Sequence, residues 1–551
     1  MKYSVVLATF LVLATQAVAQ REHGVRPTET GGPLMFEQAA FDVLIYDISI
    51  SADPKTKSIT GTTVMTAKIV IPTNVIVLDL DPAYTISKLT ESPRKELRYE
   101  RRGGKVWIWF PMTQQAGEVI RTAIQYKGTP RVAPNPPWVG GFIWTKTPSG
   151  ADWISVALQN DGADLLFPCK DHPSDKPSNA TMRITVPDPL VASGPGRLEG
   201  VKKNTDGTTT YNWRMMNPIA NYSLVFNAAP YKVIEDTVPS VSGWLVPMQF
   251  YILPESYEQG AKLIAETKKY HAFFEKFLGP FPFRTIKLGI VETPHLGMEH
   301  STNIAYGNKF RFAEDGFDSL MFHEYGHEWW ANLVTASDWR DFWIHEGFQS
   351  FMDTLWVEET KGKDAYFTAM KNRAKTFRNK QPVAPREPKI AYQVYMAEPD
   401  YKTSDGDIYG KGAYVLHTLR YLIGDEAFFK ALRHMAYPTK LMETYTDGRQ
   451  ERLVNTDDFL TIAEADSGMD LDWFFELYLR QPKLPKLVTD TKGDTLNMRW
   501  ETPGDMPFPM PIDIVINGRP RRVAMPNGRG SVDFSGPAPV VDPNGWVLKG
   551  Q

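Results

Sequence analysis

Apolar and polar positions follow two different periods along this chain. Between about residues 36 and 233 short runs alternate, as where Tyr46, Ile48 and Ile50 are separated by polar residues. An alternation of period two is typical of half-buried β-strands. No helical pattern separates these runs, so we expect antiparallel sheets. Further strands of this kind are predicted at residues 58–70, 75–80, 97–101, 105–110, 121–126, 182–186 and 222–226.

From about residue 240 the period becomes helical. Apolar residues recur every three or four positions from Tyr257 to Leu278, and Gly279-Pro280 ends that helix. A helix around residues 321–330 is expected to be capped near Asp315 or Asp318. Other helices are predicted at 342–359, 409–423 and 471–479, with one more capped at 456–458, and strands at 285–291 and 303–306.

The pattern returns to strands near the C-terminus. Residues 495–500 and 512–516 alternate, and Asn-Gly pairs such as Asn517-Gly518 mark tight turns. The whole pattern predicts a multidomain α+β protein. We expect an N-terminal antiparallel β-saddle or β-sandwich domain at 24–235, a mostly helical domain at 236–482 and a small C-terminal β-sandwich at 484–551.

The first nineteen residues have the pattern of a signal peptide. Lys2 precedes a short apolar run at Val5–Thr15, and Ala17-Val18-Ala19 is a small-residue cleavage signal. We therefore expect an exported protein, either periplasmic or secreted. No later apolar run is long enough to span a membrane.

Composition excludes some classes of function. The net charge is −3, so nothing suggests nucleic acid as a partner. Cys169 is the only cysteine, which rules out an internal disulfide. We expect its thiol to be buried and structural.

The candidate chemistry centres on His323, Glu324 and His327, in the spacing H-E-x-x-H. Two histidines four residues apart share one helix face and can hold one metal ion, with the glutamate placed to accept a proton from water. Eighteen residues lie between His327 and Glu346. Glu346 is on the next predicted helix, where its carboxylate can become a third ligand. Two imidazoles and one carboxylate leave a fourth position for water, so we expect one catalytic Zn²⁺ per chain.

This spacing resembles that of the gluzincin aminopeptidases, the family of aminopeptidase N and leukotriene hydrolase. The resemblance covers most of the chain and implies that the helical domain is thermolysin-like. It implies a zinc metallo-aminopeptidase that hydrolyses the N-terminal residue from peptides with a free N-terminus. Many members also carry a large helical C-terminal domain, which we do not expect here because the sequence after the helical domain is short and β-rich.

The family's G-x-M-E-N segment is matched here by Leu296-Gly297-Met298-Glu299-His300. The resemblance implies that Glu299 binds the substrate α-ammonium, and that Gly297 and Met298 contact the extended substrate. A carboxylate at the closed end of a site pairs with an ammonium and rejects internal peptide bonds. Leu296 and His300 depart from the family's glycine and asparagine.

Two further positions take roles from the resemblance. Tyr409 begins a Y-x-K-G segment, which implies a hydroxyl donor to the oxyanion of the tetrahedral intermediate. Gln159 precedes a stretch at Phe167–Ser174 that resembles the family's β-domain loop, so it is a second candidate for the amine pocket.

Other functions remain open at this point. The chain could be a non-catalytic family member that binds peptides, or an endopeptidase with the same zinc chemistry. An epoxide hydrolase is disfavoured, because Tyr401 stands where that branch has an acidic residue, with Asp400 beside it. The preferred first residue and the oligomeric state do not follow from the sequence.

Overall fold

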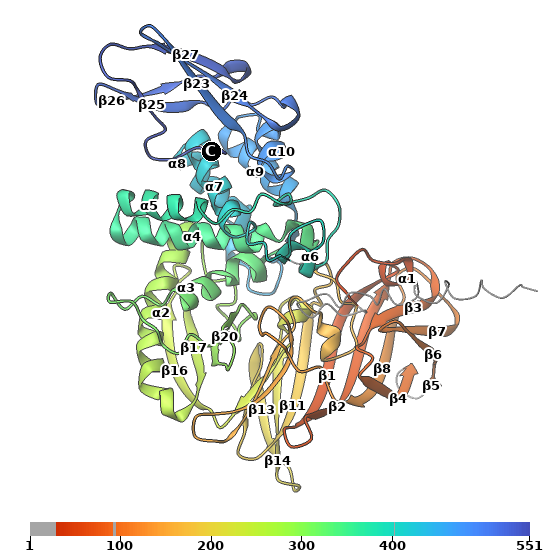
Figure 1. Cartoon of the computed structure of the whole chain (residues 1–551). Coiled ribbons are helices and arrows are strands. Elements are labelled where there is room, and N and C mark those ends of the chain that lie inside the picture. Colours follow the sequence, from red (N-terminus) through yellow and green to blue (C-terminus); the bar gives the residue numbers. More distant parts are fainter. Residues whose placement is uncertain (1–28, 92–94, 402, 551) are drawn as a thin grey trace, which may run out of the picture.

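The structure is a computed structural model that describes residues 29–91, 95–401 and 403–550. Figure 1 shows a β-rich part, a mostly helical part and a small β part at the opposite end, in chain order. This arrangement confirms the expected multidomain α+β fold. The predicted signal peptide, residues 1–19, lies outside the described residues.

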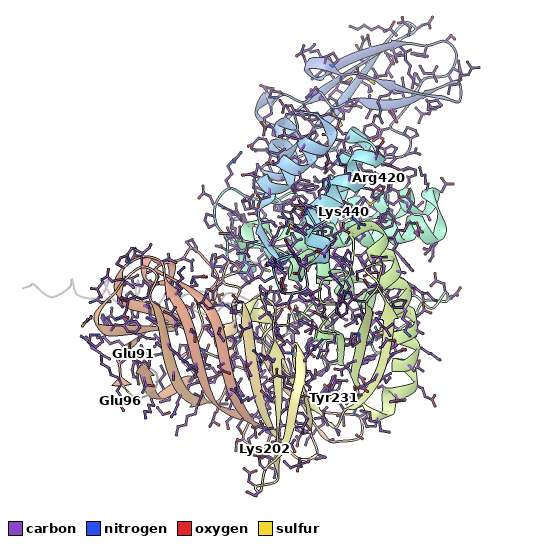
Figure 2. All side chains as sticks on the ribbon, turned by 180° about the vertical axis from the view of Figure 1, so that it is seen from behind. Glu91, Glu96, Lys202, Tyr231, Arg420 and Lys440 are labelled. Carbon is purple, nitrogen blue, oxygen red and sulfur yellow. The ribbon has the colours of Figure 1, made fainter. Side chains whose placement is uncertain are left out.

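The β-rich part is built on one eight-stranded sheet with the order β13-β14-β11-β1-β2-β8-β4-β5. Alternate residues are buried, as in β1, where Tyr46, Ile48 and Ile50 lie inside. Its strands are β1 (Phe41–Asp53), β2 (Ser58–Ile69), β4 (Tyr84–Glu91), β5 (Lys95–Glu96), β8 (Val119–Gly128), β11 (Asn179–Pro187), β13 (Arg197–Lys203) and β14 (Thr208–Met215). Figure 2 shows Lys202 near one edge of this sheet and Glu91 and Glu96 near the other.

Two smaller sheets complete the β-rich part. Their orders are β12-β15-β10-β9 and β3-β7-β6, and the short helix α1 (Phe36–Ala39) precedes β1. The strands are β3 (Thr73–Asp79), β6 (Arg98–Arg102), β7 (Lys105–Gln114), β9 (Gly141–Lys146), β10 (Asp152–Ala157), β12 (Val191–Ser193) and β15 (Asn227–Ala229). The C-terminal end of β10 is important for the site, because Gln159 follows it.

One pairing differs from the antiparallel expectation. β1 and β11 run parallel, with Ile48 opposite Met182. Parallel neighbours need a crossover connection. The chain between β8 and β11 supplies it, because it passes through β9 and β10 in another sheet. The alternation within a strand does not record its direction, so the sequence pattern could not indicate this pairing.

The prediction of a strand at residues 222–226 is wrong. Residues Asn221–Ser223 form a 3-10 turn, and β15 begins only at Asn227. Tertiary contacts explain the difference. The Tyr222 hydroxyl donates to the Glu299 carboxylate at 2.9 Å, and Ser223 Oγ accepts from the Ser301 amide at 3.3 Å. These bonds to the helical part replace a strand ladder.

The helical part begins with a five-stranded sheet of order β16-β17-β18-β20-β19. The expected boundary between residues 235 and 236 falls inside β16, which pairs along its length with β17. The strands are β16 (Lys232–Pro239), β17 (Leu245–Ile252), β18 (Leu288–Glu292), β19 (Gly297–Met298) and β20 (Ile304–Tyr306), with α2 (Tyr257–Leu278) between β17 and β18. α2 has the predicted bounds.

The remaining helices carry the candidate chemistry. They are α3 (Ser319–Gly326), α4 (Trp343–Lys361), α5 (Lys363–Ala374), α6 (Ala391–Tyr395), α7 (Gly410–Ile423), α8 (Asp425–Ala436), α9 (Thr456–Ser467) and α10 (Asp472–Leu479). The N-cap of α9 is Asn455, one residue before the predicted cap, because its side chain accepts from the Asp457 and Asp458 amides. No helix among the described residues is long and apolar enough to cross a membrane.

Two glycines let α4 and α7 cross in close contact. A Cβ atom added at Gly347 would lie 3.0 Å from Gly412 Cα and 2.9 Å from the Ile408 carbonyl oxygen. These neighbours are backbone atoms, which cannot move aside as a side chain can. α4 carries Glu346, and Tyr409 directly precedes α7, so this crossing sets how near the two side chains lie.

The C-terminal part has the expected two small sheets, β23-β24-β27 and β26-β25-β28. Asn517-Gly518 forms the predicted turn between β25 and β26, and both residues have positive φ. The strands are β23 (Lys486–Lys492), β24 (Thr495–Glu501), β25 (Ile512–Ile516), β26 (Arg519–Val523), β27 (Arg529–Asp533) and β28 (Val540–Val541).

The helix crossing leads to a test of stability. Gly347→Ala should lower the free energy of unfolding by about 1–3 kcal/mol, because the added methyl group forces two backbones apart. Urea denaturation would measure this loss. Gly200→Ala is the control, since an added Cβ there meets nothing within 4 Å. Equal stability of the Gly347→Ala variant and the wild type would contradict the close backbone contact between Gly347 and Gly412.

Candidate active site

The helix α3 and its C-cap residue, His327, present two histidines to one point. The Asp318 side chain caps the start of α3 by accepting from the Met321 amide at 2.9 Å, which confirms one of the two predicted caps. His323 and His327 lie one turn apart on the same face, and their Nε2 atoms are 3.2 Å apart. At this distance the two nitrogens can share one proton or bind one metal ion between them.

Glu346, in the first turn of α4, brings a third atom to the same point. Its Oε2 atom lies 3.4 Å from His323 Nε2 and 3.5 Å from His327 Nε2. Donor atoms in a tetrahedral zinc site stand about 3.3 Å apart, given bonds of about 2.0–2.2 Å. Oε2 is buried and has no hydrogen-bond partner among the described residues. The three residues therefore fit one metal ion, as predicted.

A second layer of contacts orients both histidines. His323 Nδ1 lies 3.0 Å from the Asp353 carboxylate, and His327 Nδ1 lies 2.8 Å from the Trp330 carbonyl oxygen. Such contacts fix the ring and leave Nε2 for the metal. Sequence reasoning missed Asp353, although it stands two helical turns after Glu346 on the same face of α4.

The charges around this point favour a cation. Burial lowers the pKa of His323, but the Asp353 and Glu346 carboxylates outweigh burial and hold it well above its usual range. Burial raises the pKa of Glu346, yet His327 and His323 together hold it below its usual range. A divalent ion would provide the positive charge that these carboxylates attract.

Glu324 lies beside the three ligands and lines the same cavity. Burial raises its pKa to about 8, and the nearby Glu299 carboxylate adds to the effect. Strand β19 passes directly over it, since a Cβ atom on Gly297 would lie 2.2 Å from Glu324 Oε1. A carboxylate with a raised pKa beside a metal site is suited to accept a proton from water.

Glu299 is a buried residue of the same cavity, and it has two partners from the β-rich part. Gln159 Nε2 donates to Glu299 Oε1, and the Tyr222 hydroxyl donates to the same oxygen at 2.9 Å. Burial raises the pKa of Glu299. The structure thus brings Gln159 and Glu299 together, as the resemblance implied. Tyr222 was missed because its segment was taken for a strand.

A pair of tyrosines also lines the cavity. The Tyr409 ring stacks on the His323 ring with centroids 6.2 Å apart, and its hydroxyl lies 3.2 Å from the Tyr395 hydroxyl. Tyr395, at the end of α6, also lies 3.4 Å from both Glu346 Oε1 and Gln159 Oε1. Burial raises the pKa of both tyrosines well above 10, so both hydroxyls keep their protons. Tyr395 belongs to no sequence motif, so it was not predicted as a site residue.

These groups surround one cavity of about 210 Å³. All nine predicted site residues line it. The lining residues are Pro137, Trp138, Gln159, Asn160, Leu296, Gly297, Met298, Glu299, Leu320, His323, Glu324, His327, Glu346, Tyr395 and Tyr409.

The two departures in the segment around Glu299 have different consequences. The His300 side chain is fully buried away from the cavity, and burial lowers its pKa to about 3. Leu296 lines the cavity and is 38% exposed. Cys169 is a buried free thiol whose pKa is raised by burial, which agrees with the structural role expected for it.

Comparison with known families agrees with this geometry. The peptidase family M1 domain matches residues 261–478, and the peptidase M1 N-terminal domain matches residues 43–223. The chain belongs to the peptidase M1 family. The first match contains the three ligands with Glu324, Glu299 and Tyr409, and the second contains Gln159.

Several M1 relatives are similar along much of the chain. Tricorn protease-interacting factor F2 of Thermoplasma volcanium is 23% identical over 68% of this chain and 47% of its own length. Human glutamyl aminopeptidase is 25% identical over 68% of this chain and 39% of its own length. The chain thus spans half or less of the length of these relatives.

Solved M1 structures share the fold. A Deinococcus radiodurans M1 zinc metallopeptidase variant bound to a Tyr-Ser-Ala substrate superimposes with a TM-score of 0.65. The match covers 84% of this chain and 97% of that one at 23% identity. The fold of this M1 chain is therefore that of a zinc metallopeptidase, and its ligand set fits one such ion.

The contact between Asp353 and His323 leads to a prediction about zinc affinity. Asp353→Ala should weaken zinc binding by about 10–100-fold, because His323 loses the carboxylate that orients its ring. Titration against a competing chelator would measure the change. Glu359→Ala is the control, since Glu359 is on the same helix but forms only an exposed ion pair with Lys276. Unchanged affinity in the Asp353→Ala variant would contradict the role given to this carboxylate.

Proposed function

We propose that this chain is a zinc-dependent aminopeptidase that removes the first residue from peptides with a free N-terminus. The observation that carries the proposal is that two features line one small cavity. These are the three atoms that can hold a metal and, near His327, the buried Glu299 carboxylate with two hydrogen-bond donors. An α-ammonium bound to that carboxylate leaves the first peptide bond near the metal position.

The chain's own residues supply the steps around the bond. Glu299 and Gln159 bind the ammonium, and β19 offers backbone groups to the extended peptide. A zinc ion held by His323, His327 and Glu346 would polarise the carbonyl group and acidify a water molecule. A Glu324 carboxylate oxygen accepts the proton from water and delivers it to the leaving amine. The Tyr409 hydroxyl donates to the oxyanion.

The buried surroundings of Glu299 argue against an endopeptidase. A peptide bound by its middle has no ammonium to pair with Glu299, and its chain would have to continue past Gln159 and Tyr222, which are both buried. A buried carboxylate without a counter-charge is costly. The complete set of ligands, base and hydroxyl donor gives no support to a non-catalytic role.

The names of the relatives leave the first residue open. They include glutamyl aminopeptidase and a leucine aminopeptidase of Vanderwaltozyma polyspora. These names place opposite demands on the pocket that holds the first side chain, because one side chain is charged and the other apolar.

We also propose that the protein acts outside the cytoplasm. The support is the sequence pattern of residues 1–19, with its positive start, short apolar run and Ala-x-Ala signal. N-terminal sequencing of the mature protein after expression tests this proposal. A first residue at position 20 is the expected result, and a retained Met1 would contradict it.

The proton-transfer role of Glu324 gives a direct test. Glu324→Gln should reduce turnover of aminoacyl coumarin substrates by a thousandfold or more while zinc content stays near one per chain, since an amide cannot accept the proton. Metal analysis and fluorescence assays measure both quantities. Turnover near the wild-type rate would refute the assignment.

The role of Glu299 is tested by the substrate's own N-terminus. Glu299→Ala should lower kcat/KM for free aminoacyl substrates by about a hundredfold, because a buried ammonium loses its carboxylate. Wild-type enzyme should not cleave N-acetylated versions of the same substrates. Exposed Glu255→Ala is the control. If the Glu299→Ala variant cleaves free substrates normally, the amine is bound elsewhere.

A further inference from the structure

The cavity lining includes large apolar side chains to which the proposed reaction gives no task. Trp138 and Leu296 belong to it, and they are 50% and 38% exposed. Met298 and Pro137 belong to the same lining but are buried. Large apolar side chains left open in a cavity are typical of a surface that a ligand covers. We call Pro137, Trp138, Leu296 and Met298 the apolar wall.

Trp138 follows a segment with prolines at positions 130, 134, 136 and 137, and this segment is held at fixed points. The Asn160 side-chain amide donates to the Trp138 carbonyl oxygen at 3.1 Å. The Asp161 carboxylate accepts from the Gly140 amide at 2.6 Å and pairs with Arg131 at 2.8 Å. These anchors directly follow Gln159 in the chain. The position of Trp138 is thereby tied to the amine-binding end of the cavity.

The other half of the apolar wall is tied to the same end. Leu296 and Met298 flank Gly297 in the segment that continues into Glu299. Both halves therefore adjoin the residues that bind the ammonium, one next to Gln159 and one next to Glu299. A side chain in contact with this wall belongs to the residue whose ammonium is bound there.

The charges of the cavity work against an acidic first residue. Among the described residues, its ionisable lining consists of Glu299, Glu324 and Glu346 with His323 and His327, apart from the two tyrosines, and includes no lysine or arginine. All five have tasks in the proposed reaction. A carboxylate side chain would meet three others without a cation of its own. The carboxylates are also engaged, so a lysine or arginine side chain finds no spare partner.

We infer that the apolar wall, and Trp138 above all, selects peptides whose first side chain is large and apolar, and rejects acidic ones. This inference rests on the proposed aminopeptidase function and adds the substrate class. An aliphatic or aromatic side chain would cover the exposed faces of Trp138 and Leu296 and remove them from water.

The test compares first residues in the zinc-loaded full chain. Wild-type kcat/KM for leucyl and phenylalanyl aminomethylcoumarin should exceed that for glutamyl aminomethylcoumarin at least tenfold. Trp138→Ala should lower the leucyl and phenylalanyl values about tenfold, as expected when apolar contact is lost. The alanyl value should change less than twofold, because a methyl group does not reach the indole. Trp138→Phe should keep most of the preference.

Trp244→Ala is the matched control. Trp244 is also 50% exposed but lies between β16 and β17, outside the cavity. This variant should leave every ratio unchanged. Equal cleavage of glutamyl and leucyl substrates by the wild type would overturn the inference. So would a Trp138→Ala variant that lowers all substrates equally, since that result indicates a general structural role for the loop.

A binding measurement separates this inference from the proposed function. Calorimetry with the Glu324→Gln variant and the peptides Phe-Ala-Ala, Ala-Ala-Ala and Glu-Ala-Ala needs no turnover. The Phe peptide should bind at least tenfold more tightly than the Glu peptide, and adding Trp138→Ala should remove most of that difference. If the wild type cleaves nothing, the proposed function fails while these affinities still decide the inference. Equal affinities for the three peptides would refute it.

Discussion

Three ligand atoms from two helices stand 3.2–3.5 Å apart, and the helical part is arranged to keep them there. Without a cation, a buried carboxylate oxygen would have no partner, and the two imidazoles would face each other. The arrangement therefore depends on rigid neighbours. Asp353 and the Trp330 carbonyl oxygen orient the rings, and the Asp318 cap fixes where α3 begins. The glycine contact between α4 and α7 then sets the distance from Glu346 to the Tyr409 hydroxyl.

The substrate end of the site depends on a different constraint, the meeting of the β-rich and helical parts. Glu299 belongs to the helical part, but its partners Gln159 and Tyr222 come from the β-rich part. Trp138 reaches the same cavity on a segment anchored next to Gln159. The candidate metal-binding residues thus come from one part of the chain, whereas the proposed substrate contacts come from both. On the proposed function, this division would let the zinc chemistry stay constant while loops of the β-rich part set which first residue fits.

Much of the site could be predicted because its spacing is local. H-E-x-x-H puts two ligands on one helix face, and the following helix brings Glu346 into reach. The helix α2 and the Asp318 cap also followed from periodicity and capping chemistry. Tyr222 and Tyr395 could not be predicted, since neither belongs to a motif and both reach the site through contacts between distant segments. The prediction of a strand at 222–226 was wrong for the same reason. Hydrogen bonds to Glu299 and Ser301 outweigh the local β-propensity of this segment.

The sequence by itself determined the fold class and the family and predicted the three candidate metal ligands and the candidate proton acceptor, since periodicity and motif spacing are properties of short stretches of chain. Only the tertiary structure decided which groups complete the cavity. It placed Gln159 against Glu299, paired β1 with β11 in parallel, buried His300 outside the cavity lining and left Leu296 and Trp138 exposed in it. Those outcomes depend on packing between segments more than a hundred residues apart, which no local pattern records.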